Sequence, residues 1–192
     1  LELMEHIDFF RAHDLASSRL LAWLAPPGMQ EWGPWRVTFA GMGNLFIPDT
    51  FKLDDKLLVL VMELPILGVD AAFCGALVRS LMNGPYRQYQ QQESQLLTQP
   101  HRLLDYLNLQ LLESGLRHSF SMAALLFDQE DGLVFANAGL TSPHWLMRSG
   151  GLPLGLMRSS RYGLHKRSWH EPFELQFRSD NGSALKMQVR HH

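Results

Sequence analysis

The order of the segments that resemble strands and helices is the feature that most constrains the fold of this chain. Residues 35–40, 45–51 and 57–64 are rich in β-branched, aromatic and leucine residues, and two helical patterns follow them directly. From about residue 119 onward, short apolar runs are again separated by turn residues. A doubly wound parallel sheet would alternate strand and helix throughout, so this order predicts an α+β fold with largely antiparallel sheets.

The sequence gives signals for the end of the first helix and the start of the second. The first, rich in small residues, is expected to run to the stop signal at residues 83–85, with a ragged continuation through the glutamines at 90–92. Residues 86–99 are polar and are interpreted as a solvated helix face or a loop without chemistry. The second helix begins at Pro100, and its regularly spaced leucines predict a buried face.

The strands of the second half are joined by polar turns at residues 128–132 and 179–182, which predict hairpins. The expected strands are residues 119–127, 133–138, 144–148, 164–169, 173–178 and 184–189.

Composition limits the classes of protein to which the chain can belong. Hydrophobic residues make up 46% of the 192 residues, which is enough for one ordinary core. The formal net charge of -2 gives no reason to expect nucleic acid or an anionic membrane as a partner. No apolar run reaches the roughly 20 residues of a membrane-spanning helix. The single cysteine, Cys74, is expected to be a buried thiol, which fits a cytoplasmic protein.

The familiar catalytic motifs are missing from the sequence. The nine histidines form no metal-binding pattern, and neither a hydrolase serine elbow nor a phosphate-binding loop is present. A locally basic stretch is interpreted as a scattered solvated surface, with an acidic partner as the alternative. Its basic residues are Arg148, Arg158, Arg161, Lys166 and Arg167.

Two parts of the chain, residues 133–140 with 151–156 and residues 57–72, resemble the SpoIIE-type branch of the protein phosphatase 2C family. Residues 133–140 are similar to its strand with an Asn-Ala-Gly turn, and residues 151–156 to its later Leu-Gly element. Residues 57–72 are similar to a strand, a metal-binding segment and a helix that opens with paired alanines. The resemblance implies a phosphatase-2C-like sandwich of largely antiparallel sheets flanked by helices.

The same resemblance implies that the metal motifs of the family are degenerate here. The positions that match them are Asn44, Met62, Glu63, Ile66, Leu67, Gly68 and Asp180. Two hard divalent cations need several carboxylates, and only Glu63 and Asp180 supply one. Asn44 offers a neutral oxygen, and Met62 and Leu67 are apolar. We therefore expect no metal, no cofactor and no catalytic residue, as in a pseudophosphatase.

Within this branch the chain resembles the output domains of response regulators that act as adaptors for proteolysis. Residues 77–84, 107–109, 138–140 and 152–155 carry that likeness. It implies that residues 1–25, which lack an initiator methionine and have helical apolar spacing, are a connecting signalling helix from a receiver domain outside this chain. Residues 26–192 would then be the effector domain. The implied partners are a sigma factor, the protease to which it is delivered, and the receiver domain.

Two alternatives stay open. An active metal-dependent serine/threonine phosphatase could act on an anti-sigma factor antagonist through Glu63 and Asp180. A scaffold could also sequester such an antagonist without any proteolysis.

Overall fold

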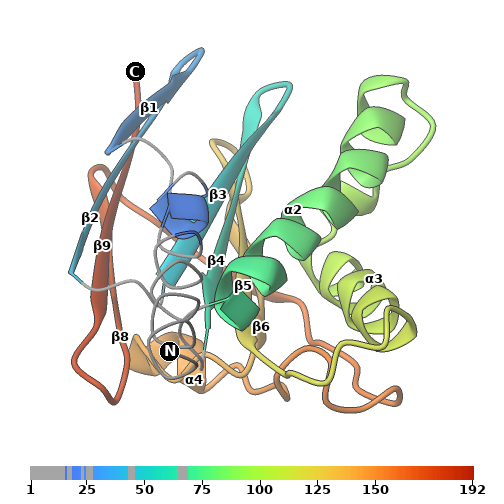
Figure 1. The fold of residues 1–192 in the computed structure, drawn as a ribbon. Helices are drawn as coiled ribbons and strands as arrows, with labels where there is room; N and C mark the ends of the chain where they lie inside the picture. Colours follow the sequence, from blue (N-terminus) through green and yellow to red (C-terminus); the bar gives the residue numbers. More distant parts are fainter. Residues whose placement is uncertain (1–15, 17–18, 23, 25–27, 43–45, 65–68) are drawn as a thin grey trace, which may run out of the picture.

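Three layers make up the computed structural model, which describes residues 16, 19–22, 24, 28–42, 46–64 and 69–192 (Figure 1). A five-stranded sheet lies in the middle, two helices cover one of its faces, and a four-stranded sheet packs on the other. Most of the expected connecting helix lies outside the described residues, and its role in signalling stays a prediction.

The five-stranded sheet has the order β3-β4-β5-β6-β7, and every neighbouring pair is antiparallel. Strand β4 is buried on both faces, which explains why its sequence is an almost continuous apolar run. The bounds are β3 (Phe46–Leu53), β4 (Lys56–Glu63), β5 (Ser121–Asp128), β6 (Gly132–Ala138) and β7 (His165–Arg167).

The four-stranded sheet has the order β1-β2-β9-β8 and is also antiparallel throughout. Strand β8 alternates buried and exposed residues, as expected for a sheet with one face on the core and one in water. The bounds are β1 (Met29–Trp32), β2 (Trp35–Met42), β8 (Phe173–Arg178) and β9 (Ala184–His191).

The helical layer consists of α2 (Val69–Gln90) and α3 (Pro100–Glu113), with a short 3-10 turn η1 (Leu96–Thr98) between them. Helix α2 continues past Pro85 for more than one turn. Its C-terminal end is held against the β3–β4 hairpin, because the Tyr86 ring packs 5.4 Å from that of Phe51 and the Tyr89 hydroxyl donates to Asp54. A further helix, α4 (His144–Met147), has a single turn.

The central sheet separates two hydrophobic cores. Leu58 and Leu60 face α2 and α3 in the helix-side core, whereas Leu57 and Val59 face the other sheet in the sheet–sheet core. The residues alternate because successive side chains of a strand point to opposite faces. No helix of the described residues is long and apolar enough to cross a membrane.

The sequence-based predictions of the elements are confirmed with two exceptions. The α+β class, the antiparallel sheets, the two helices, the two hairpins and the buried Cys74 are all present. The predicted strand at 144–148 is wrong: Pro143 precedes a helical turn there, and its carbonyl accepts from the amides of Leu146 and Met147. Strand β1 was not predicted, because an edge strand of sequence MQEW carries no apolar alternation.

Candidate functional site

One end of the sandwich brings together the two acidic residues that match the metal motifs. Glu63 ends β4, where it is paired with Phe46 of β3 and Ser121 of β5. Asp180 lies in the turn between β8 and β9, and its charge acts on Glu63. The fold therefore places Glu63 and Asp180 near each other although they belong to different sheets.

The surroundings of Glu63 favour its protonated form. Burial raises the pKa of this carboxyl above the ordinary value of 4.5, a hydrogen bond with Ser179 opposes the shift, and the charge of Asp180 adds to it. Two neighbouring carboxyl groups at the rim of a core can share a proton or attract a cation.

Met62 belongs to the opposite face of the same strand. Its side chain is buried in the helix-side core, on the face of β4 opposite to Glu63. It lines a small internal space beneath α2, next to Gly75 and the side chains of Asp49 and Arg79. The apolar side chain at this position is therefore part of the packing between sheet and helix.

An ion pair that the sequence did not reveal lies under α2. Arg79 donates through Nε to the Asp49 carboxylate at 3.2 Å and through a terminal nitrogen to the Leu24 carbonyl at 2.8 Å. Burial raises the pKa of Asp49, although the charge of Arg79 opposes the shift. The only sequence signal for this pair was an aspartate within a strand that is otherwise mostly buried.

The remaining metal-motif positions, Asn44, Ile66, Leu67 and Gly68, lie outside the described residues. Their sequence neighbours in the two gaps, residues 43–45 and 65–68, include no carboxylate and no histidine. Among the residues that the structure does describe, no three histidine, cysteine or acidic side chains gather into a possible metal site. Of the positions that match the family's metal motifs, Glu63 and Asp180 are the ones with a carboxylate.

The Asn-Ala-Gly turn after β6 has a structural role. Asn137 is buried, and its side-chain amide donates to the carbonyls of Leu140 and Leu146 at 2.9 Å. Its side-chain oxygen accepts from the Leu140 amide at 3.0 Å. These side-chain hydrogen bonds all lie within the turn and α4, so the Asn137 side chain fixes the path of the chain there.

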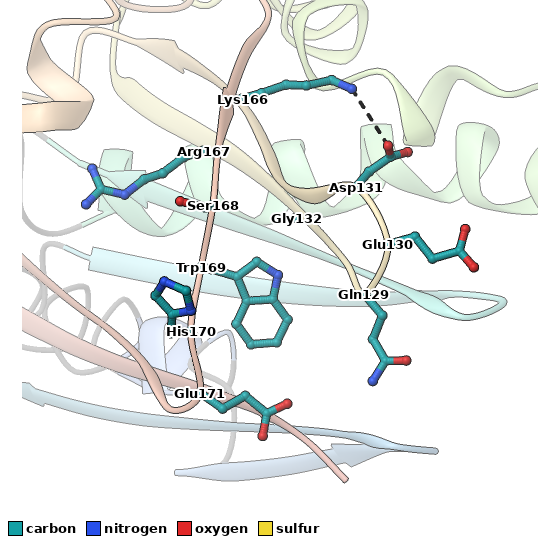
Figure 2. A pocket seen from close by; sticks show the side chains of 10 residues that line it. All are labelled: Gln129, Glu130, Asp131, Gly132, Lys166, Arg167, Ser168, Trp169, His170 and Glu171. Carbon is teal, nitrogen blue, oxygen red and sulfur yellow. Dashed lines mark ion pairs between the residues drawn. The ribbon is translucent and has the colours of Figure 1, made fainter.

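A shallow pocket of about 740 Å³ lies at the other end of the sandwich (Figure 2). The β5–β6 turn and the connection from β7 to β8 line it, and Lys166 forms an ion pair with Asp131 at 3.9 Å. The Trp169 ring packs against Phe127 in the sheet–sheet core, and its indole nitrogen donates to the Asp128 carbonyl. Both acidic and basic side chains line this pocket, so its charge favours no single class of ligand.

A second depression, of about 510 Å³, lies between the end of α2 and the β3–β4 hairpin. Trp32, Lys52 and Tyr89 are among its lining residues. Burial raises the pKa of the Tyr89 hydroxyl, and its hydrogen bond to Asp54 adds to the shift, so Tyr89 acts as a donor there. The sequence had suggested only a spacer in this region.

Comparison with known proteins gives the fold and no family. No protein-family model matches the chain, and no curated protein matches it significantly. The crystal structure of the RsbU and RsbW domains of Rv1364c from Mycobacterium tuberculosis matches with a TM-score of 0.57 and 12% identity, over 81% of this chain. The match spans only 61% of the length of that longer protein.

A second solved structure, RsbX in complex with magnesium, matches with a TM-score of 0.51 and 10% identity, over 85% of this chain and 98% of that one. The chain has a protein-phosphatase-2C-like fold. The expected sandwich of antiparallel sheets flanked by helices is thereby confirmed. At identities of 10% and 12%, these matches show a shared fold and nothing more.

Proposed function

We propose that this phosphatase-2C-like domain is the non-catalytic output domain of a response regulator, which binds a sigma factor as an adaptor for regulated proteolysis. A receiver domain preceding this chain would control it, by favouring one of two arrangements with different affinity for the sigma factor. The proposal rests on the resemblance of the sequence to the output domain of the adaptor RssB, which delivers the stationary-phase sigma factor to the ClpXP protease.

The observation that supports this proposal is the donor set at the Glu63 end of the sandwich. Glu63 and Asp180 are the acidic residues that match the metal motifs, and the pKa of Glu63 is raised by burial. A two-metal phosphatase needs several ionised carboxylates to offset the charge of the cations and to set up the nucleophilic water. Only two of the matched positions carry a carboxylate, and this supports a domain whose task is binding and not hydrolysis.

The direct test is capture of the stationary-phase sigma factor by the full-length protein from the same cell. We expect saturable binding that survives a chelator and the substitution Glu63→Ala, and faster degradation of the sigma factor when the protease is added. Absence of binding by the full-length protein, with the receiver in either phosphorylation state, would remove this function.

The second candidate is an active serine/threonine phosphatase acting on an anti-sigma factor antagonist. It is favoured by the proximity of Glu63 and Asp180, and by the magnesium bound to the similar RsbX structure. Manganese titration by calorimetry, together with a phosphopeptide assay, separates the two functions. Tight metal binding and a turnover that Glu63→Ala abolishes would establish the phosphatase.

A further inference from the structure

The part of the chain between Asp131 and Glu171 contains no acidic residue. It holds five of the 17 lysine and arginine residues, while the rest of the chain holds all 19 acidic ones and only 12 basic ones. Arg148, Arg158 and Arg161 lie between the end of α4 and β7. The charge of this region is therefore opposite in sign to that of the rest of the domain.

The loop between α4 and β7 is held firmly although it has little regular structure. Asn108 of α3 is buried, donates to the Met157 carbonyl and accepts from the Gly155 amide, both at 2.9 Å. Leu154 is fully buried and exchanges two backbone hydrogen bonds with Phe120. These anchors on α3 and at the start of β5 fix the loop from within.

Three large apolar side chains of the same loop face solvent. Leu152, Leu156 and Met157 are 45%, 50% and 48% exposed. In Figure 1 this segment is the orange loop that passes below α3. Protein-binding surfaces are enriched in Met and Arg and combine apolar side chains with a polar rim. We call residues 152–161, with these three side chains and Arg158 and Arg161, the presenting loop.

We propose that the presenting loop binds an acidic amphipathic segment of the protein partner. The apolar side chains would enter its hydrophobic face, and Arg158 and Arg161 would meet the acidic residues beside that face. This inference rests on the proposed function, in which the partner is the captured sigma factor. Arg158 lies 3.5 Å from Glu113, but both side chains are well exposed, so this ion pair can exchange for one with the partner.

A protein segment fits this surface better than a lipid surface does. Stable binding to an anionic membrane requires a long amphipathic helix or an extended basic patch. The presenting loop offers three apolar side chains and two arginines, and the rest of the domain carries an excess of acidic residues that an anionic membrane would repel.

The first experiment measures sigma factor binding to surface variants of the full-length protein. We expect Leu156→Ser/Met157→Ser to weaken binding on the order of tenfold, and Arg158→Glu to weaken it severalfold with a smaller dependence on salt. The matched controls are Met29→Ser, 56% exposed on β1, and Lys186→Glu, which also has an exposed acidic partner. If the wild type binds and the loop variants bind equally well, the inference is wrong and the proposed function stands.

The second experiment is independent of the sigma factor. A designed peptide with leucines along one helical face and glutamates on the others is titrated into the protein, and backbone amide shifts are recorded. Saturable shifts confined to the presenting loop and its neighbours, absent with a lysine version of the peptide, would support the inference even if the sigma factor does not bind. No binding, shifts elsewhere, or binding to anionic vesicles in place of the peptide would overturn it.

Discussion

Gly150 and Gly151 are neighbours with similar backbone conformations and different surroundings. Both have positive φ, 73° and 105°, a region that residues with a Cβ rarely adopt. A Cβ on Gly150 would meet nothing within 4 Å, but on Gly151 it would lie 2.1 Å from the Asn137 carbonyl oxygen. Position 151 therefore requires a glycine for two reasons: its backbone has a positive φ, and the Asn137 carbonyl leaves no room for a Cβ.

This difference gives a matched pair of substitutions. We expect Gly150→Ala to lower the free energy of unfolding by about 1 kcal/mol, the usual cost of left-handed backbone. Gly151→Ala should cost on the order of 3 kcal/mol or more, because the Asn137 segment must move. Urea denaturation of both variants measures the difference, and equal losses would show that the turn accommodates the methyl group.

The raised pKa of Glu63 predicts how stability depends on pH. The folded state binds the proton of Glu63 more tightly than the unfolded state does, so this residue makes the protein less stable as pH rises above about 4.5. The substitution Glu63→Gln removes this loss of stability, together with the repulsion between Glu63 and Asp180. We expect the variant to be more stable than the wild type at about pH 7 and equal to it below about pH 4.

Urea denaturation at both pH values provides the measurement. Glu174→Gln is the control, because Glu174 is an exposed residue of β8 that pairs with Lys186 at the surface. A Glu63→Gln variant that is less stable than the wild type at neutral pH would contradict this expectation.

At the scale of elements, Asn108 determines whether the presenting loop stays in place. Asn108→Ala leaves the Gly155 amide and the Met157 carbonyl without their partner, at a cost of about 2 kcal/mol. We expect faster hydrogen exchange at Gly155 and weaker binding of the acidic peptide, although no exposed side chain has changed. Gln110→Ala, which removes only an exposed contact to Glu113, should change neither.

The sequence predicted those elements whose apolar pattern directly reflects which of their faces are buried. β4 and β5 are buried on both faces and α3 on one, so their apolar patterns were unambiguous. The pattern failed where tertiary contacts decide. Residues 144–148, which were expected to form a strand, contain one helical turn that buries only Leu146.

The candidate site was predictable only in its residue types. Glu63 and Asp180 could be singled out by their likeness to family motifs, but their proximity depends on how the two sheets pack. The Asp49–Arg79 pair and the anchoring role of Asn108 join residues far apart in the sequence, and nothing local distinguishes them from ordinary polar residues. The exposure of Leu156 and Met157 was likewise invisible, because apolar residues are expected to be buried.

At the scale of the whole molecule, the two cores share one sheet and should be lost together. Leu57 and Leu58 are adjacent in β4, both fully buried, and belong to the sheet–sheet and helix-side cores. We expect Leu57→Ala and Leu58→Ala each to lower the free energy of unfolding by about 2–5 kcal/mol. Each should reduce hydrogen-exchange protection equally in α3 and β9. Loss confined to one layer would show two separate folding units.

In the presenting loop, different residues serve folding and binding. The residues that fix it, Asn108, Leu154 and Gly155, are different from those that it exposes, Leu152, Leu156 and Met157. Substitutions at the exposed positions leave the hydrogen bonds and the cores intact, so they carry little penalty in folding. Related domains are thus free to change the partner they recognise within a few mutations, while inheriting the same scaffold unchanged.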